Sequence, residues 1–161
     1  MEATIRPLRP EEIPVIEEIA VLAWRRIYEH FHELQQQRLG TIARAYSLED
    51  KRRQVREFSL ANPGCVLVSE LAGEVVGFIT FTLDRERKIG VIGNNAVRPE
   101  HAGKGIGSAQ YRAVLEIFRG EGMQFASVTT GLDEAHAPAR KAYEKVGFVP
   151  VLSFVEYMMV L

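Results

Sequence analysis

Residues 97–107 read VRPEHAGKGIG, a glycine-rich loop that joins two segments with different hydrophobic patterns. The segment before it, residues 89–97, contains isoleucine and valine as strands do, but it is interrupted by Gly93, Asn94 and Asn95. The segment after it carries apolar residues at helical spacing, namely Ile106, Ala113, Val114, Ile117 and Phe118. This order predicts a strand, a glycine loop and a helix, and the three poor strand formers predict a β-bulge.

The composition of this loop suits the binding of an anion. Glycines let backbone N–H groups turn toward one point, the following helix N-terminus adds about half a positive charge, and Lys104 can add a full one. The combination fits a phosphate or pyrophosphate, although a tight connection in any α/β fold could use the same glycines. The spacing of Gly103, Gly105 and Gly107 matches neither the Gly-x-Gly-x-x-Gly pattern nor a P-loop, which argues against nicotinamide enzymes and ATPases.

The rest of the chain alternates between segments typical of strands and of helices. Pro10 and the two acids after it favour a helix start, and an apolar stripe from Ile13 to Phe31 indicates a long helix. Further helices are expected over residues 47–60, from about 106 to 118, and over 138–146. The expected strands are residues 3–9, 66–71, 74–83, 89–97, 125–130, 148–151 and 153–161. The fold class predicted is therefore α/β, of the mixed α+β kind.

Length and composition limit the classes of protein to consider. The chain has 161 residues, 47% hydrophobic and 25% charged, which predicts one globular domain over residues 1–161. A formal net charge of −1 lacks the basic excess of nucleic-acid-binding proteins. No apolar run approaches the roughly 20 residues that span a membrane, and residues 1–10 lack an apolar signal segment. We therefore expect a cytoplasmic protein with no nucleic-acid or membrane partner.

The sequence does not predict a metal centre or a disulfide framework. Cys65 is the single cysteine, and His30 and His32 would point to different sides of a helix. We expect no metal cofactor. The second helix carries a basic cluster that we expect to be a solvated face, made of Lys51, Arg52, Arg53 and Arg56.

A second motif, HAPARKAYEKVGF, occupies residues 136–148. The glycine loop followed by an Ala-x-x-x-Tyr-Glu-Lys-x-Gly-Phe ending closely resembles the GNAT superfamily of acetyl-CoA-dependent N-acetyltransferases, and the resemblance covers essentially the whole chain. It implies the GNAT fold, a central mixed, mostly antiparallel sheet of about seven strands flanked by about four helices. It also implies that acetyl-CoA is the acyl donor and that the acceptor is a primary amine.

The resemblance implies roles for individual residues. Loop amides would bind the CoA pyrophosphate, at Gly103, Lys104, Gly105, Ile106, Gly107 and Ser108. The preceding strand would pair with pantetheine through Asn95, Ala96 and Val97, and the bulge would splay two parallel strands to admit the acyl chain. His136 would contact the cofactor, and Tyr143 would serve the thioester sulfur as the catalytic residue.

The acceptor pocket and the general base are less well defined. In this family the first two helices often wall the acceptor pocket, so Trp24 and Tyr28 are candidates for it, with core packing as the competing interpretation of each. His136 could also cap its helix, a role compatible with cofactor contact. The fourth and fifth strands carry no carboxylate to act as base. Deprotonation of the amine could fall to Asp133 or Glu134 through water, or to no residue.

Two positions depart from the family pattern. Ala102 stands where Arg or Gln is usual, and His136 stands where Asn is usual. One lost charge-assisted hydrogen bond costs ~1.5 to 3 kcal/mol, which predicts weaker but not absent CoA binding. With the missing base, these departures leave a catalytically decayed CoA-binding regulatory module as an alternative, against which the retained Tyr143 argues. Transfer of a larger acyl group is a second alternative, and a homodimer, common in the family, is possible.

Overall fold

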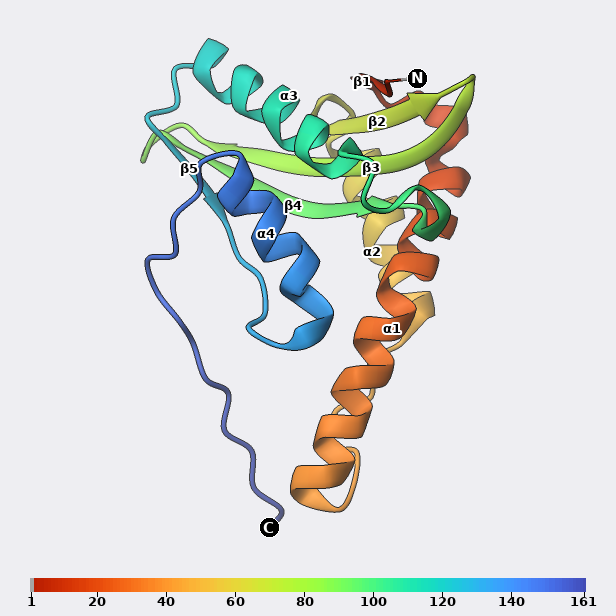
Figure 1. The fold of residues 1–161 in the computed structure, drawn as a ribbon, viewed down its shortest axis with the longest axis vertical. Coiled ribbons are helices and arrows are strands. Elements are labelled where there is room, and N and C mark those ends of the chain that lie inside the picture. Colours follow the sequence, from red (N-terminus) through yellow and green to blue (C-terminus); the bar gives the residue numbers. More distant parts are fainter. Residues whose placement is uncertain (1) are drawn as a thin grey trace.

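The computed structural model describes residues 2–161. Its centre is a five-stranded sheet in the order β1 (Thr4–Pro7), β2 (Val66–Leu71), β3 (Glu74–Asp84), β4 (Ile89–Val97) and β5 (Phe125–Val128) (Figure 1). The first four strands are antiparallel, and β5 runs parallel to β4. The predicted mixed, mostly antiparallel sheet is therefore confirmed.

Four α-helices within residues 2–161 cover this sheet, as predicted. They are α1 (Ile13–Leu39), α2 (Leu48–Ala61), α3 (Ile106–Gly120) and α4 (Ala137–Lys145). The helix α1 extends beyond the expected end at Phe31 and stops where Gly40 adopts a left-handed conformation with φ 73°. Its buried residues lie in its first turns, from Ile13 to Ala20, and its C-terminal half extends past the sheet (Figure 1).

The two faces of the sheet pack against different helix pairs. Val66, Val68 and Phe78 join a core with α1 and α2, whereas Leu67 and Ile79 join a second core with α3 and α4. Successive residues of a strand point to opposite faces, so the apolar runs in β2 and β3 supply both cores. The sheet is thus buried on both sides.

The predicted β-bulge in β4 is confirmed. Ile79 pairs with Asn95 and Phe81 with Ile92, so Thr80 alone faces both Gly93 and Asn94. Thr80 Oγ1 accepts a hydrogen bond from Asn94 N at 2.8 Å. A Cβ on residue 93 would lie 2.6 Å from Thr80 Oγ1, which explains why a glycine occupies this position.

The two parallel strands separate at this bulge. β5 pairs with β4 over Ile89–Ile92 only. Within residues 2–161, the outer edge of β4 from Gly93 to Val97 therefore has no neighbouring strand. This places a row of free main-chain hydrogen-bonding groups beside the gap between the strands.

The prediction of two closing strands, at 148–151 and 153–161, is wrong for this structure. Residues 149–161 form no strand, and their apolar side chains are exposed, with Phe154 76% and Tyr157 90% accessible. The segment runs away from the sheet (Figure 1). Glu156 within it pairs with Arg44 at 2.9 Å. Strand propensity expresses fit to a pleated, half-buried surface, and this segment does not lie on one. Over residues 2–161 the sheet consequently has five strands instead of about seven.

One further finding concerns the helices. None that the structure describes between residues 2 and 161 combines the length and apolar character needed to cross a membrane.

Candidate active site

The N-terminus of α3 presents a set of free backbone donors. Its N-cap is Gly105 with φ 81°, and Gly103 before it has φ 75°, conformations that a glycine adopts without strain. The first intrahelical bond runs from Ala109 N to Gly105 O, and no side chain among residues 2–161 caps the helix. The N–H groups of Ile106, Gly107 and Ser108 therefore lack helical acceptors and can bind an anion, as the sequence predicted.

Two cations flank this helix N-terminus. The exposed Lys104 places Nζ 3.2 Å from His101 Nδ1. A cavity of about 150 Å³ beside the loop is lined by Lys104, Gly105, Ile106 and Arg112, among others. Arg112 was not predicted from the sequence, although its position about two turns into the same helix was a signal for it. The donor set therefore fits a polyanionic group such as a pyrophosphate.

Asn95 connects β4 to the buried tyrosines of α3 and α4. Its side-chain Nδ2 donates to the Tyr111 hydroxyl at 2.6 Å, and its Oδ1 accepts from the Tyr143 hydroxyl at 3.1 Å. Asn95 lies directly after the bulge, on the part of β4 whose outer edge is open. The Tyr143 hydroxyl is thus fixed beside the gap between β4 and β5.

Tyr143 is 7% exposed and belongs to the core as well as to the candidate site. Its ring centroid lies 4.8 Å from that of Tyr111. Burial raises the pKa of Tyr143, which outweighs the lowering effect of its hydrogen bond with Tyr111. The phenol therefore keeps its proton at neutral pH and can act as a hydrogen-bond donor.

His136 lies at the start of α4 but does not cap it. Among the described residues its ring caps no helix amide; instead Nδ1 lies 2.7 Å from Asp133 Oδ2, and the ring stacks on Phe31 with a centroid distance of 5.9 Å. Burial opposes ionisation of Asp133, but the hydrogen bond and charge of His136 prevail, so the pKa of Asp133 is lowered. The interpretation of His136 as a side-chain cap of α4 is wrong, because its ring nitrogen bonds to Asp133 and not to a helix amide. The lowered pKa makes the Asp133 carboxylate a weaker base.

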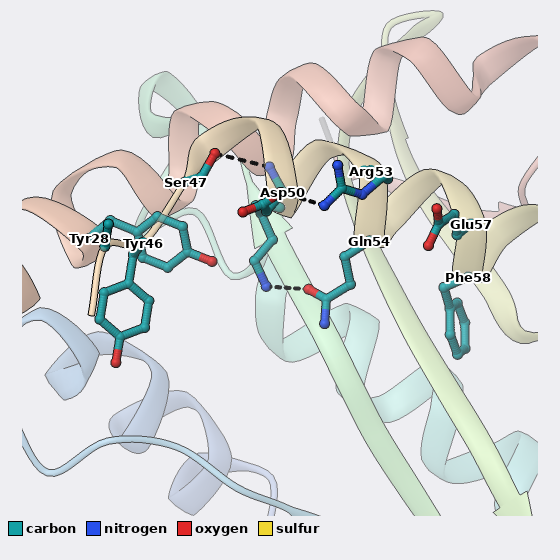
Figure 2. A pocket seen from close by; sticks show the side chains of 10 residues that line it. Tyr28, Tyr46, Ser47, Asp50, Arg53, Gln54, Glu57 and Phe58 are labelled. Atoms are coloured by element: carbon teal, nitrogen blue, oxygen red, sulfur yellow. Dashed lines mark hydrogen bonds and ion pairs between the residues drawn. The ribbon is translucent and has the colours of Figure 1, made fainter. Parts of the chain in front are cut away.

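On the other face of the sheet, a cavity of about 500 Å³ opens between the α1–α2 connection and α2 (Figure 2). Tyr28 lines it, as the sequence predicted for the acceptor pocket, and its ring centroid lies 5.3 Å from that of Tyr46. Burial raises the pKa of Tyr28. Trp24 is not among the described lining residues; it packs against the core of α1 and α2.

Lys51 lines the same cavity and contradicts the expectation of a solvated basic face. Lys51 is only 8% exposed. Its Nζ donates to Gln54 Oε1 at 2.6 Å and to Asn94 Oδ1 at 3.2 Å. The Trp24 ring centroid lies 4.4 Å from Nζ. Burial lowers the pKa of Lys51 to about 8. The burial of Lys51 could have been predicted from its spacing, because the buried residues of α2 are Lys51, Val55 and Ser59, each four residues after the last.

Two neighbouring asparagines, one in the bulge and one directly after it, therefore contact two different sites. Asn94 accepts from Lys51 on the side of α2, and Asn95 accepts from Tyr143 on the side of α4. The bulge therefore links Lys51, which lines the cavity of about 500 Å³, to the strand whose outer edge is open.

Comparison with known proteins identifies the architecture. The profile described as the acetyltransferase (GNAT) family matches residues 19–148. The chain belongs to this family. The match includes the bulge, the glycine loop and Tyr143, so the predicted GNAT membership is confirmed.

Solved GNAT structures share the fold. Ard1 from Thermoplasma volcanium is 24% identical, with a TM-score of 0.68, and the alignment covers 94% of this chain and 86% of that one. A GNAT acetyltransferase from Brucella melitensis, solved with acetyl-CoA, is 24% identical, with a TM-score of 0.65 and coverage of 97% and 90%. Both similarities support the fold observed for this GNAT chain.

A curated relative is similar over part of its length. The N-acetylaspartate synthetase of Xenopus tropicalis is 30% identical over 95 residues, which is 58% of this chain. The chain spans about a third of that relative, 34% of its length.

Proposed function

We propose that this protein transfers an acetyl group from acetyl-CoA to a primary amine by direct attack of the amine on the thioester. The observation that carries the proposal is the presence of three features in one fold. They are the free amides of α3, the open edge of β4 and the Tyr143 hydroxyl held at Asn95. Neighbours solved with acetyl-CoA and with coenzyme A, the latter from Thermoplasma acidophilum, support the same donor.

Binding of the donor would use main-chain groups for the most part. The amides at residues 103–108, with Lys104, would hold the pyrophosphate, and the open edge from Asn95 to Val97 would pair with the pantetheine amides. Backbone recognition of this kind tolerates the Ala102 departure. His136, at the start of α4, would contact the same cofactor with the ring nitrogen that Asp133 leaves free.

The reaction needs an oxyanion donor and a partner for the departing sulfur. A backbone N–H near Val97 would serve the oxyanion, because the bulge leaves donors on that edge without a strand partner. The Tyr143 hydroxyl would serve the sulfur. Because burial raises the pKa of Tyr143, a strong hydrogen bond fits this role better than complete proton transfer.

An active enzyme is favoured over a decayed CoA-binding module. The Tyr143–Asn95 hydrogen bond is intact, and a cavity lies on the other side of the bulge, where an acceptor would approach. The cytoplasmic location, the single domain and the homodimer remain predictions from the sequence.

The test of this function combines binding with turnover. Acetyl-CoA at about 100 times its Kd should raise the melting temperature by roughly 5 to 10 °C, since a ligand of the folded state stabilises it by about 2.7 kcal/mol. A panel of amines, including amino acids, peptides, polyamines and aminoglycosides, is then followed by release of free thiol. A thermal shift without thiol release from any amine would support the regulatory module instead.

A further inference from the structure

Lys51 differs from every other lysine in the chain. The sequence has five lysines, and the remaining four are exposed, at positions 88, 104, 141 and 145. The Lys51 ammonium is surrounded by neutral partners, the Gln54 and Asn94 side-chain oxygens and the Trp24 ring. No carboxylate of residues 2–161 lies within ion-pair distance of it.

The charged groups nearest to Lys51 do not compensate for its burial. From α2, Asp50, Arg53 and Glu57 line the same cavity, and Asp50 is paired with Arg53. From α1 and the connection after it come the phenols of Tyr28 and Tyr46, and from β4 the neutral amide of Asn94. With a pKa of about 8, roughly one Lys51 side chain in ten carries no charge at pH 7.

The position of Lys51 suits the role of general base, for which the sequence predicted no residue. Its Nζ lies on the cavity side of the bulge, bonded to Asn94, while the next residue, Asn95, holds the Tyr143 hydroxyl on the far side. An amine that reaches the open edge of β4 from the cavity would pass Lys51. A lysine buried among neutral groups is a recognised form of general base.

We propose that Lys51 is the general base that deprotonates the acceptor amine beside the β-bulge of β4. This inference rests on the proposed acetyl transfer. The neutral Lys51 amine takes one proton from the acceptor ammonium and becomes an ammonium itself. The acceptor nitrogen then forms a bond to the thioester carbonyl carbon, the carbon–sulfur bond breaks, and the second amine proton goes to the sulfur. Lys51 finally releases its proton to water in the cavity.

Two variants separate a base from a fixed charge and from a structural link. Lys51→Arg keeps a cation and hydrogen-bond donors but cannot be neutral near pH 8, and Lys51→Met removes both. Each should lower kcat/KM about 10²-fold at pH 7 for the best amine of the panel, with acetyl-CoA affinity unchanged. Lys141→Arg and Lys141→Met, at an exposed lysine of α4, should match the wild type.

The pH dependence of kcat/KM distinguishes a general base from a structural residue, because a purely structural role of Lys51 would not change its shape. Wild-type kcat/KM should rise with pH and level off near 8, whereas in both Lys51 variants it should continue to rise up to the acceptor's own pKa. A fluorinated analogue of the same amine, with a lower pKa, should recover most of the loss in Lys51→Met. Wild-type activity in Lys51→Arg would overturn the inference and would show that position 51 needs only a fixed positive charge.

The outcomes also separate this inference from the proposed function. A wild type that binds acetyl-CoA but acetylates no amine overturns both. An active wild type whose Lys51 variants keep its rate and pH profile overturns the base alone. If both variants lose kcat/KM equally but keep the wild-type inflection near pH 8, Lys51 only links α2 to β4. That result would also overturn its assignment as the general base.

A stability measurement tests the state of Lys51 without any acceptor. The pKa of Lys51 is lower in the folded chain, about 8, than the ordinary lysine value of 10.5, so the unfolded chain binds more protons between these values. Wild-type stability should therefore rise, relative to Lys51→Met, as pH increases from about 8 to 10.5. Melting temperatures of both proteins across this range provide the check. A constant difference would show that the Lys51 ammonium is not desolvated.

Discussion

Replacement of Tyr143 by phenylalanine should lower turnover by ~10² to 10⁴ and leave acetyl-CoA binding nearly unchanged. The ring would still fill its place against Tyr111, so the core loses only the hydroxyl. What disappears is the Tyr143 hydroxyl, which the structure holds beside the open edge of β4 through Asn95. Steady-state thiol release and calorimetry with CoA would measure the two effects separately.

A matched control keeps this experiment specific. Tyr157→Phe makes the same chemical change at a side chain that is 90% exposed, and it should behave as the wild type. If Tyr143→Phe turns over acetyl-CoA at the wild-type rate, the phenol has no catalytic role and Tyr143 is a core residue. Because burial raises the pKa of Tyr143, we expect no inflection from its ionisation below pH 10.

Replacement of Gly105 by valine should abolish measurable CoA binding. Gly105 is the N-cap of α3 and has φ 81°, a left-handed conformation that a β-branched residue adopts only with strain. The substitution would therefore shift the first turn, whose N–H groups at Ile106, Gly107 and Ser108 form the anion site. Calorimetric titration with CoA would measure the loss.

Backbone strain and loss of the site can be separated with a second glycine. Gly73 has φ 85° in the turn between β2 and β3, and a Cβ there would meet open space, as it would at Gly105. Gly73→Val should lower the melting temperature to a similar extent and yet retain CoA binding. Unimpaired binding by Gly105→Val would contradict the assignment of the glycine loop as the pyrophosphate site.

The parts of the site that the sequence predicted are those set by local chain geometry. The glycine loop requires positive φ values at Gly103 and Gly105, and both are observed. The poor strand formers at 93–95 form a bulge because Thr80 faces two of them. Both features depend on residues adjacent in sequence, so the residue types themselves carry the information.

Features that depend on distant contacts were not predictable in this way. Lys51 was grouped with its charged neighbours, but its burial arises because α2 packs on α1 and presents it to Trp24 and Asn94. The stacking of His136 on Phe31 likewise joins segments about 100 residues apart. Local propensity also overestimated the closing strands, since residues 149–161 lie on no sheet surface.

The contact between Lys51 and Trp24 has a spectroscopic consequence. Trp24 is the only tryptophan of the chain, so all of its indole emission arises from the ring that lies 4.4 Å from the Lys51 nitrogen. Indole fluorescence responds to a nearby charge. The intensity and wavelength of that emission therefore provide a label-free signal for the protonation of one side chain, and for any amine that displaces water around it.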